Sequence, residues 1–457
     1  MNSVFMYTLA IVNFIFMLHI GLYTIGANSY DILRMKKEYE QRKKKARINN
    51  SKPRKQKLVS VIIPAHNEEK VIRRTLDSVL SNNYLNIEIL VVNDGSTDKT
   101  ASIVKGYIKR IKRNKFLQVW SYFTRDNHYR PFRVRRISVR RKNCRIKLIT
   151  QKNQGKAAAL NNAINNHAKG QLIMTLDADS ILHPQAIEKS VAYFKDNRII
   201  GVAANVRIIE STGYLNKLQR FEHLIGYRSK KMFSLTNCEF VIGGVASTYR
   251  KSTLKKVHCY DEDTVTEDIG LSMKIISKFG NKDKRIVYGA DVVALTEGVG
   301  SFSDLLKQRY RWKLGNLQNI YKYRNLIASQ DNIYSKMLTH YRLPMAILSE
   351  ILLLIEPFLL LYILYLSLQY RSLGIIIGAY LTITIYVLSV LWPDEHLRKF
   401  EKIKLSSTAL WIYCAFYLMD IVQYYSIFKT IVNHQLVFKP NKSLKTWISP
   451  KRNMRTA

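Results

Sequence analysis

Two aspartates one residue apart, Asp177 and Asp179, directly follow an apolar run at residues 172–176. An apolar run of this length predicts a buried strand, and open α/β sheets bind ligands beyond the carboxyl ends of their strands. Carboxylate oxygens are the ligands that hard cations such as Mg²⁺ or Mn²⁺ prefer. A cation there could bridge a diphosphate and stabilise it as a leaving group. Taken alone, an Asp-x-Asp sequence can equally be part of a surface loop.

A third aspartate, Asp94, follows a second strand-like run at residues 88–92 and precedes a Gly-Ser-Thr turn. In that position its carboxylate could accept hydrogen bonds from a nucleotide base or ribose. The alternative is that the turn only caps the next helix through Ser96 or Thr97. Asp94 by itself does not decide between the two interpretations.

The sequence Thr266-Glu267-Asp268 precedes an apolar-periodic run at residues 269–276, which predicts a helix. One interpretation is a simple helix N-terminus. The other is catalytic, because sugar transfer with inversion needs a carboxylate that takes the proton of the attacking hydroxyl. Asp268 is the candidate for this general base.

A fourth cluster runs from Gln308 through Arg311 to Trp312, shortly before a long apolar stretch. Arg311 could clamp a diphosphate through paired hydrogen bonds, and Trp312 offers an apolar face on which a sugar ring could stack. An amphipathic helix at a membrane interface is the competing interpretation, because Arg and Trp are also favoured there.

The segments that must position these residues alternate between strand-like and helix-like patterns. We expect strands at 59–63, 88–92, 172–176 and 199–206, and helices at 68–80 and 155–167. Strands that alternate with helices predict an α/β layer with a largely parallel sheet. The acidic groups at the strand ends would then meet at one edge of that sheet.

The region before this domain predicts a membrane anchor. Residues 3–30 contain no charged side chain, and residues 5–27 are long enough to cross a hydrocarbon core of about 30 Å. The absence of a basic start and of a small-residue cleavage site favours a retained anchor over a cleaved signal peptide. Twelve Lys or Arg between 34 and 57 place the following side in the cytoplasm.

The predicted organisation is therefore a transmembrane helix at 1–30, a basic juxtamembrane linker at 31–57 and a cytosolic domain at 58–342. About three further transmembrane helices at 343–430 and a basic tail at 431–457 follow. Four spans agree with a cytoplasmic loop at 394–404, but they leave the basic tail outside, against the charge rule. That conflict disappears if one stretch is interfacial or re-entrant.

Three acidic residues lie inside the later apolar stretches, namely Glu350, Glu356 and Asp420. Buried in lipid they are costly unless paired or exposed to water. They could line a polar channel for a polysaccharide or simply mark the ends of spans, and the sequence leaves both open.

The composition favours anionic partners. The 457 residues carry 73 Lys and Arg against 33 Asp and Glu, a net charge of +40, and are 47% hydrophobic with a mean hydropathy of −0.14. With apolar spans present, membrane lipid and phosphate are favoured over nucleic acid. A segment at about 105–147 holds sixteen Lys or Arg, and we expect it to lean on anionic lipid. The four cysteines lack the spacing of a zinc site or a disulfide framework.

Taken together, these motifs resemble those of processive family 2 glycosyltransferases, such as cellulose, chitin, hyaluronan and poly-N-acetylglucosamine synthases. That family carries D, DxD, TED and QxxRW motifs in this order between membrane helices. The segments Pro64-Ala65-His66-Asn67-Glu68-Glu69 and Gly155-Lys156-Ala157-Ala158-Ala159-Leu160-Asn161 are similar to two further family motifs. The resemblance covers roughly residues 57–316. Residues 243–247 stand where the family often has a Gly-rich acceptor loop, which leaves acceptor choice open.

The resemblance implies a GT-A fold, a Rossmann-like α/β domain, with transmembrane helices around it. It implies Asp268 as catalytic base and Asp179 as the metal ligand for Mg²⁺ or Mn²⁺. It implies that the nucleotide-sugar is bound by Pro64, Asn67, Glu68, Asp94, Lys156, Asp177 and Asp179. It implies that the acceptor and pyrophosphate contact Glu267, Gln308, Arg311 and Trp312.

The function that follows is an inverting transfer of a sugar, by expectation N-acetylglucosamine, from a UDP-sugar to a growing β-linked polysaccharide. The expected location is the plasma membrane with the catalytic domain in the cytosol. Partners would be the UDP-sugar donor, a polysaccharide or glycan acceptor, membrane lipid and, if present, a small accessory membrane subunit. One alternative is a non-processive transferase that modifies a lipid or short glycan. An alternative of another class is a catalytically idle membrane protein that binds anionic lipid or nucleic acid.

Overall fold

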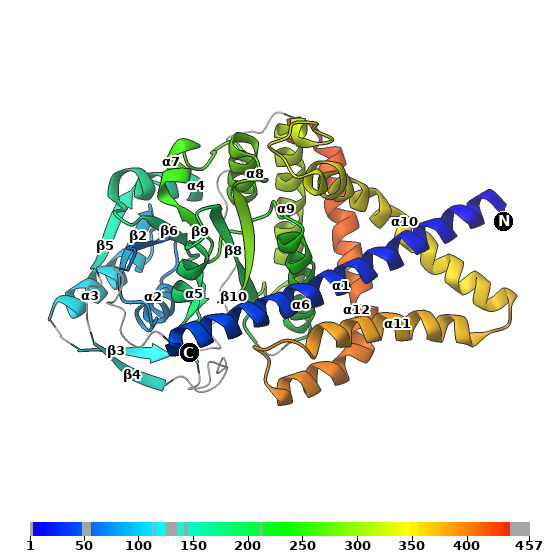
Figure 1. Ribbon diagram of the computed structural model, residues 1–457, viewed down its shortest axis with the longest axis horizontal. Coiled ribbons are helices and arrows are strands. Elements are labelled where there is room, and N and C mark those ends of the chain that lie inside the picture. Colours follow the sequence, from blue (N-terminus) through cyan, green and yellow to red (C-terminus); the bar gives the residue numbers. More distant parts are fainter. Residues whose placement is uncertain are drawn as a thin grey trace.

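The computed structural model describes residues 3–47, 56–113, 116–123, 135–140, 145–210 and 213–438. Its centre is an eight-stranded mixed sheet in the order β5–β2–β1–β6–β9–β8–β10–β7 (Figure 1). The strands are β1 (Val59–Ala65), β2 (Ile87–Asp94), β5 (Arg145–Gln151), β6 (Leu172–Thr175), β7 (Ile181–Leu182), β8 (Ile199–Ile208), β9 (Thr248–Arg250) and β10 (Arg285–Thr296). The α/β fold class expected from the sequence is confirmed.

Parallel pairing dominates one half of the sheet. Strands β5, β2, β1 and β6 are all parallel, and β8 pairs in parallel with β10. The three-residue strand β9 lies antiparallel between β6 and β8, and β7 is antiparallel to β10. Because β1, β2 and β6 run in one direction, their carboxyl ends meet at one edge, where Ala65, Asp94 and Thr175 lie.

Helices cover both faces of the sheet, which explains why its central strands read as continuous apolar runs. On one face, Val59 and Val61 pack with helix α2 (Ile72–Leu80) and with α3 (Thr100–Arg113) and α5 (Ala186–Tyr193). On the other, Ile62 packs with α4 (Lys156–Asn162), which a π-helical turn, η1 (Ala163–His167), extends. The helix expected at 68–80 starts at Ile72, because residues 68–71 form a turn around the carbonyl of Glu68.

A second group of helices lies beyond β8 and β10. It contains α6 (Tyr214–Leu235), α8 (Glu267–Phe279), α9 (Phe302–Lys322), the short 3₁₀ turn η2 (Arg324–Leu326) and the π-helical turn η3 (Met337–Arg342). Helix α7 (Lys251–Lys256) follows β9 directly and packs beside it. The basic segment at 105–147 is partly α3 and β5. Between them lies an antiparallel ribbon of β3 (Phe116–Ser121) and β4 (Arg135–Arg140). Residues 114–115, 124–134 and 141–144 of that segment lie outside the described residues.

Long helices complete the chain: α1 (Ser3–Arg47), α10 (Leu343–Gln369), α11 (Leu373–Leu391), α12 (Lys399–Val432) and the short α13 (Gln435–Phe438). In the described part of the chain, three stretches are helical, long and apolar enough to cross a membrane: Ala10–Glu40, Met337–Gln369 and Leu373–Leu391. Helix α1 continues to Arg47, through much of the segment expected as a linker. The N-terminal end of α1, with α10 and α11, projects away from the sheet (Figure 1).

Candidate active site

A cavity of about 1070 Å³ opens at the carboxyl ends of β1, β2 and β6. It brings together nearly all the residues expected at the site: Pro64, Glu68, Asp94, Lys156, Asp177, Asp179, Glu267, Asp268, Gln308, Arg311 and Trp312. Asn67 is the exception among the residues that the structure describes. Its side-chain oxygen instead accepts a hydrogen bond from the Thr97 N–H at 2.8 Å, so it joins the turns after β1 and β2.

Asp94, at the end of β2, organises the loop that leads into α4. One carboxylate oxygen accepts hydrogen bonds from Gln151 Nε2 at 2.8 Å and from the N–H of Gln154 at 3.0 Å. The other accepts from the N–H of Gly155 at 2.9 Å. At the start of helix α3, Asp98 Oδ1 accepts a hydrogen bond from the N–H of Thr100 at 2.9 Å. The Ser96 hydroxyl accepts one from the N–H of Asn67 at 3.0 Å.

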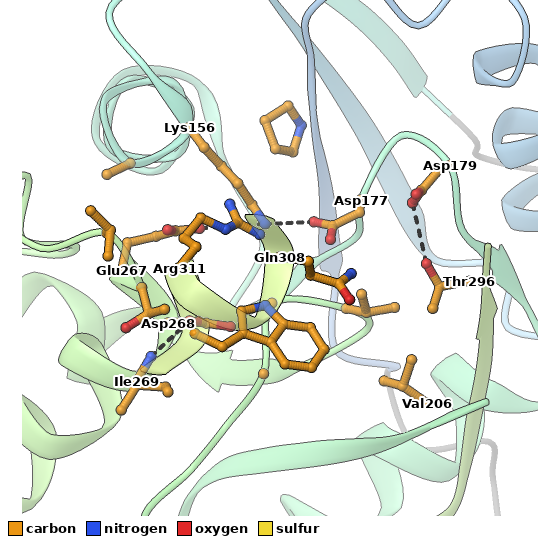
Figure 2. A pocket seen from close by; sticks show the side chains of 18 of the residues that line it. Lys156, Asp177, Asp179, Val206, Glu267, Asp268, Ile269, Thr296, Gln308 and Arg311 are labelled. Atoms are coloured by element: carbon orange, nitrogen blue, oxygen red, sulfur yellow. Dashed lines mark hydrogen bonds and ion pairs between the residues drawn. The ribbon is translucent and has the colours of Figure 1, made fainter. Parts of the chain in front are cut away.

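Lys156 begins α4 and carries its ammonium into the cavity. Its Nζ lies 2.8 Å from Asp177 Oδ1 and 3.4 Å from Glu267 Oε1 (Figure 2). Burial opposes the charge on the ammonium, but Asp177, Glu267 and Asp268 outweigh burial and raise the pKa of Lys156 well above its usual value. The lysine therefore stays charged and draws the carboxylates together.

Gly244, in the segment before β9, marks the point on which these groups converge. A Cβ atom placed on Gly244 would lie 3.0 Å from Lys156 Nζ. The same atom would lie 3.6 Å from Asp268 Oδ2 and 3.7 Å from Asp177 Oδ1. Since glycine leaves this point open, the space beside the three charged groups is available to a ligand.

Asp268, in the first turn of α8, has the properties of a general base. Burial first, and then the charge of Glu267, raise the pKa of Asp268 to about 6, although Lys156 acts in the opposite direction. Its Oδ1 accepts a hydrogen bond from the N–H of Ile269 at 2.9 Å, which fixes the carboxylate. A base with a pKa near the working pH is both ionised and able to accept a proton.

Helix α8 is held against α9 through Thr266, the residue that precedes it. In the described structure the Thr266 hydroxyl makes no cap hydrogen bond with α8 and accepts one from Asn319 Nδ2 at 3.0 Å. Gly315 faces Thr266 so closely that an added Cβ would lie 2.4 Å from the hydroxyl oxygen. The Thr-Glu-Asp segment is therefore fixed by tertiary contact with α9.

Asp179 lies on the opposite side of the cavity, where Thr296 Oγ1 donates to its Oδ1 at 3.5 Å (Figure 2). Neighbouring Arg74 bonds both to the Asp179 carbonyl and to Glu297, at 2.9 and 2.7 Å. Within the described residues, no cluster of three or more His, Cys, Asp or Glu side chains could enclose a metal ion. The Asp179 carboxylate suits a hard cation, but a cation here would need further oxygens from the donor's diphosphate and from water.

Helix α9 closes the cavity on the side of the long helices. Gln308 and Arg311 point into it (Figure 2). The buried Gln308 Oε1 has no hydrogen-bond partner in the described part of the chain, so it is an acceptor open to a ligand. The guanidinium of Arg309 stacks on the Trp312 ring at 4.3 Å and bonds to Glu222 on α6 at 2.6 Å. Arg309 and Glu222 thereby fix the indole face.

Several cavity residues escaped the sequence reasoning. On α6, His223 lines the cavity, and burial together with Arg309 lowers its pKa to about 4. Lys313 of α9 is ion-paired with Glu350 of α10, and both line the cavity, as does Gln423 of α12. Only the pairing of Glu350 answers a question that the sequence raised. No local pattern distinguishes the other residues, because their roles depend on how α6, α9 and α12 pack.

The fold and the cavity define a GT-A-type α/β domain, and comparison with known proteins gives its family. Residues 60–127 and 133–257 match the model of Glycosyl transferase family 2. The chain is 32% identical over 260 residues to a poly-beta-1,6-N-acetyl-D-glucosamine synthase from Staphylococcus epidermidis. It is 31% identical over 260 residues to the enzyme of the same name from Staphylococcus aureus. Each alignment covers 56% of this chain and 54% of the relative.

A solved mannosyltransferase from Pyrobaculum calidifontis, in complex with GDP-Man and Mn²⁺, shares the fold. Its TM-score is 0.52 at 18% identity, over 89% of this chain and 96% of that one. Residues 60–127 and 133–257 therefore belong to a glycosyl transferase family 2 domain. The family inferred from the motifs is thus confirmed. The chain spans about half the length of the curated relatives it matches, and the family match ends at residue 257, before Asp268 and α9.

Proposed function

We propose that this chain is a membrane-embedded synthase that transfers N-acetylglucosamine, with inversion, from its UDP-sugar to a growing β-linked polysaccharide. The observation that carries the proposal is the convergence of Asp268, Asp177 and Lys156 beside Gly244, in a cavity that continues to Trp312. The names of the staphylococcal relatives support N-acetylglucosamine as the sugar.

In the proposed step, an acceptor hydroxyl oxygen attacks the anomeric carbon of the donor sugar. The bond between that carbon and the phosphate oxygen breaks, and its electron pair leaves with UDP. The hydroxyl proton passes to Asp268, whose raised pKa suits it to accept the proton. Because attack and departure occur on opposite faces, the anomeric configuration inverts.

We assign the remaining residues of the cavity to the roles expected from the sequence. Nucleotide-sugar binding falls to Pro64, Glu68, Asp94, Lys156 and Asp177 around the carboxyl ends of the strands, with Asn67 holding two of the turns together. Mg²⁺ or Mn²⁺ bound at Asp179 would offset the charge that develops on the leaving diphosphate. Arg311 is suited to the pyrophosphate, and Glu267, Gln308 and Trp312 to the acceptor.

The cavity itself favours a polymer as acceptor. It extends beyond Trp312 to Lys313, and on to Glu350 of α10 and Gln423 of α12. Glu350 lies within a candidate span and Gln423 lies on α12, so polar side chains offer a hydrophilic path for a sugar chain that leaves the site. The membrane placement, with the catalytic domain in the cytosol of the plasma membrane, belongs to the same proposal.

The test is to supply labelled UDP-N-acetylglucosamine to membranes that contain the full chain and to size the product. We expect labelled polymer with the parent chain. With Asp268→Asn we expect a loss of about 10²–10⁴-fold. Glu188→Gln, which changes an exposed carboxylate outside the cavity, is the matched control and should keep parental activity. Products of one added sugar would support the non-processive alternative, and parental activity in the Asp268→Asn variant would exclude this mechanism.

A further inference from the structure

Helix α12 begins against the catalytic domain. Glu401 lies 3.7 Å from Arg220 at the start of α6, and Lys404 lies 3.2 Å from Glu210, just after β8. The Leu405 side chain is buried in the same cluster as Leu218 of α6. The first two turns of α12 therefore pack on the domain that holds the active site.

The far end of α12 returns to the same domain. Lys429 Nζ lies 4.6 Å from the centre of the Tyr310 ring on α9. Just beyond α12, Gln318 Nε2 donates to the Leu436 carbonyl at 2.8 Å, and Phe438 packs edge-on against Tyr321 at 4.8 Å. Helix α9 therefore contacts both the last turns of α12, at Lys429, and the short helix α13.

The part of α12 between these ends also follows α9. Gln423 lines the active-site cavity together with Trp312. Met419 and Val422 are buried in one cluster with Leu305, at the start of α9. Figure 1 shows α12 running alongside α9, while α10 and α11 extend away from the sheet. These contacts place the described part of α12 from Met419 onward against α9.

The length of α12 shows why contact at both of its ends bears on its place in the membrane. Its 34 residues extend over about 50 Å, and a helix that crosses the bilayer must leave its ends on opposite sides of about 30 Å of hydrocarbon. Both ends of α12 contact one domain, so they cannot be separated in that way. By contrast, the turn at 370–372, between α10 and α11, lies at the far end of a helical pair that leaves this domain.

The outer face of α12 indicates what covers it. Val422 and Ser426 are fully buried, whereas Ile421, Phe428 and Val432 are exposed, Phe428 at 68%. These exposed apolar side chains recur at helical spacing on one face. Exposed leucines and isoleucines also occur on α10 and α11. Lys399, at the start of α12, is exposed, and a basic residue beside an apolar face fits anionic lipid headgroups.

We infer that α12 does not cross the membrane but lies along its cytosolic surface, with its outer face against lipid. The chain would then cross three times, through α1, α10 and α11, and Phe438 would lie on the side of the active site. The inference rests on the membrane placement in the proposed function. It also resolves the charge conflict, because three crossings leave the basic segment at 439–455 in the cytosol, as the positive-inside rule favours.

The test adds single cysteines to the full chain and labels intact cells with a membrane-impermeant maleimide, with the parent chain as baseline. We expect labelling of Tyr370→Cys, in the turn between α10 and α11. We expect His434→Cys and the catalytic-domain control Glu188→Cys to label only after the cells are permeabilised. Labelling of His434→Cys in intact cells, at the level of Tyr370→Cys, would overturn the inference. If Tyr370→Cys does not label, the membrane placement itself is wrong.

The contact with lipid has its own readout. A nitroxide attached at Phe428→Cys in reconstituted membranes should collide more often with oxygen, which concentrates in lipid, than with a water-soluble nickel chelate. The same label at Glu188→Cys should show the reverse preference. Equal preferences at the two positions would overturn the lipid contact. This result is independent of the side of the membrane that maleimide labelling gives for the cysteines at 370 and 434.

Discussion

The ammonium nitrogen of Lys156 lies 2.8 Å from Oδ1 of Asp177, and its positive charge lowers the pKa of Asp268, which burial and Glu267 raise. Asp177 follows β6 and Lys156 opens α4, so two neighbouring crossovers of the sheet supply the pair. The charge balance of this cluster decides the pH range in which Asp268 can act as a base. It also gives the first two predictions.

Replacing Lys156 by Met should raise the pH at which activity is half lost. Without the ammonium, Asp177 and Glu267 repel the ionised form of Asp268, so its pKa rises above about 6. Because the base must be ionised, activity then falls away at a higher pH, by about 1 to 3 pH units. The measurement is kcat/KM against pH. Lys156→Arg keeps the charge and serves as the control. If the fall of kcat/KM at low pH (the acid limb) does not move in the Met variant, Lys156 does not set the pKa of Asp268.

Replacing Glu267 by Gln should move the acid limb in the opposite direction. Glu267 contributes a like charge that raises the pKa of Asp268, so removing that charge lowers the pKa and extends activity to more acidic pH. The position of the limb is the readout, because Glu267 is also assigned to the acceptor and the maximal rate can fall. A limb that moves upward would show that Glu267 does not act on Asp268 through its charge.

Replacing Gly315 by Ala should damage both stability and activity. The new methyl group would lie 2.4 Å from the Thr266 hydroxyl oxygen and would push α9 away from the start of α8, which carries Asp268. Overpacking of this kind costs about 1–3 kcal/mol. Thermal unfolding and transfer rate would be measured together.

The matched control for Gly315 is Gly226→Ala in α6. No atom lies within 4 Å of a Cβ added there, so this variant should be neutral, or more stable by up to about 1 kcal/mol from helix propensity. If the two glycine variants behave alike, close packing between α8 and α9 is not what holds Asp268.

Replacing Asp179 by Asn should weaken the dependence of the reaction on a divalent cation. An amide binds hard cations less well than a carboxylate, so the Mg²⁺ or Mn²⁺ concentration for half-maximal rate should rise at least about tenfold. A chelator should abolish the parent activity, and added cation should restore it. Glu188→Gln should titrate like the parent. Full activity of the parent chain in the chelator would exclude a metal at Asp179.

The sequence by itself determined four strands of the sheet and the approximate place of the site. Continuous apolar runs mark β1, β2, β6 and β8, because strands covered on both faces must be apolar throughout. Acidic residues directly follow two of those runs. Because the carboxyl ends of parallel strands share one edge of a sheet, these acidic residues had to meet there. These signals are local, because each is read within a few residues. They were enough to predict the family and, except for Asn67, the expected residues that line the cavity.

Tertiary structure alone decided the rest. The partners of Asp94 sit in the loop that leads to α4, and the Glu222 partner of Arg309 lies 87 residues away on α6. Strand β9, at three residues, is too short to show a periodic pattern. Hydropathy could not show that α12 follows α9, because an apolar helix face looks the same in sequence whether it meets lipid or protein. Which surface it meets is fixed only when distant segments pack.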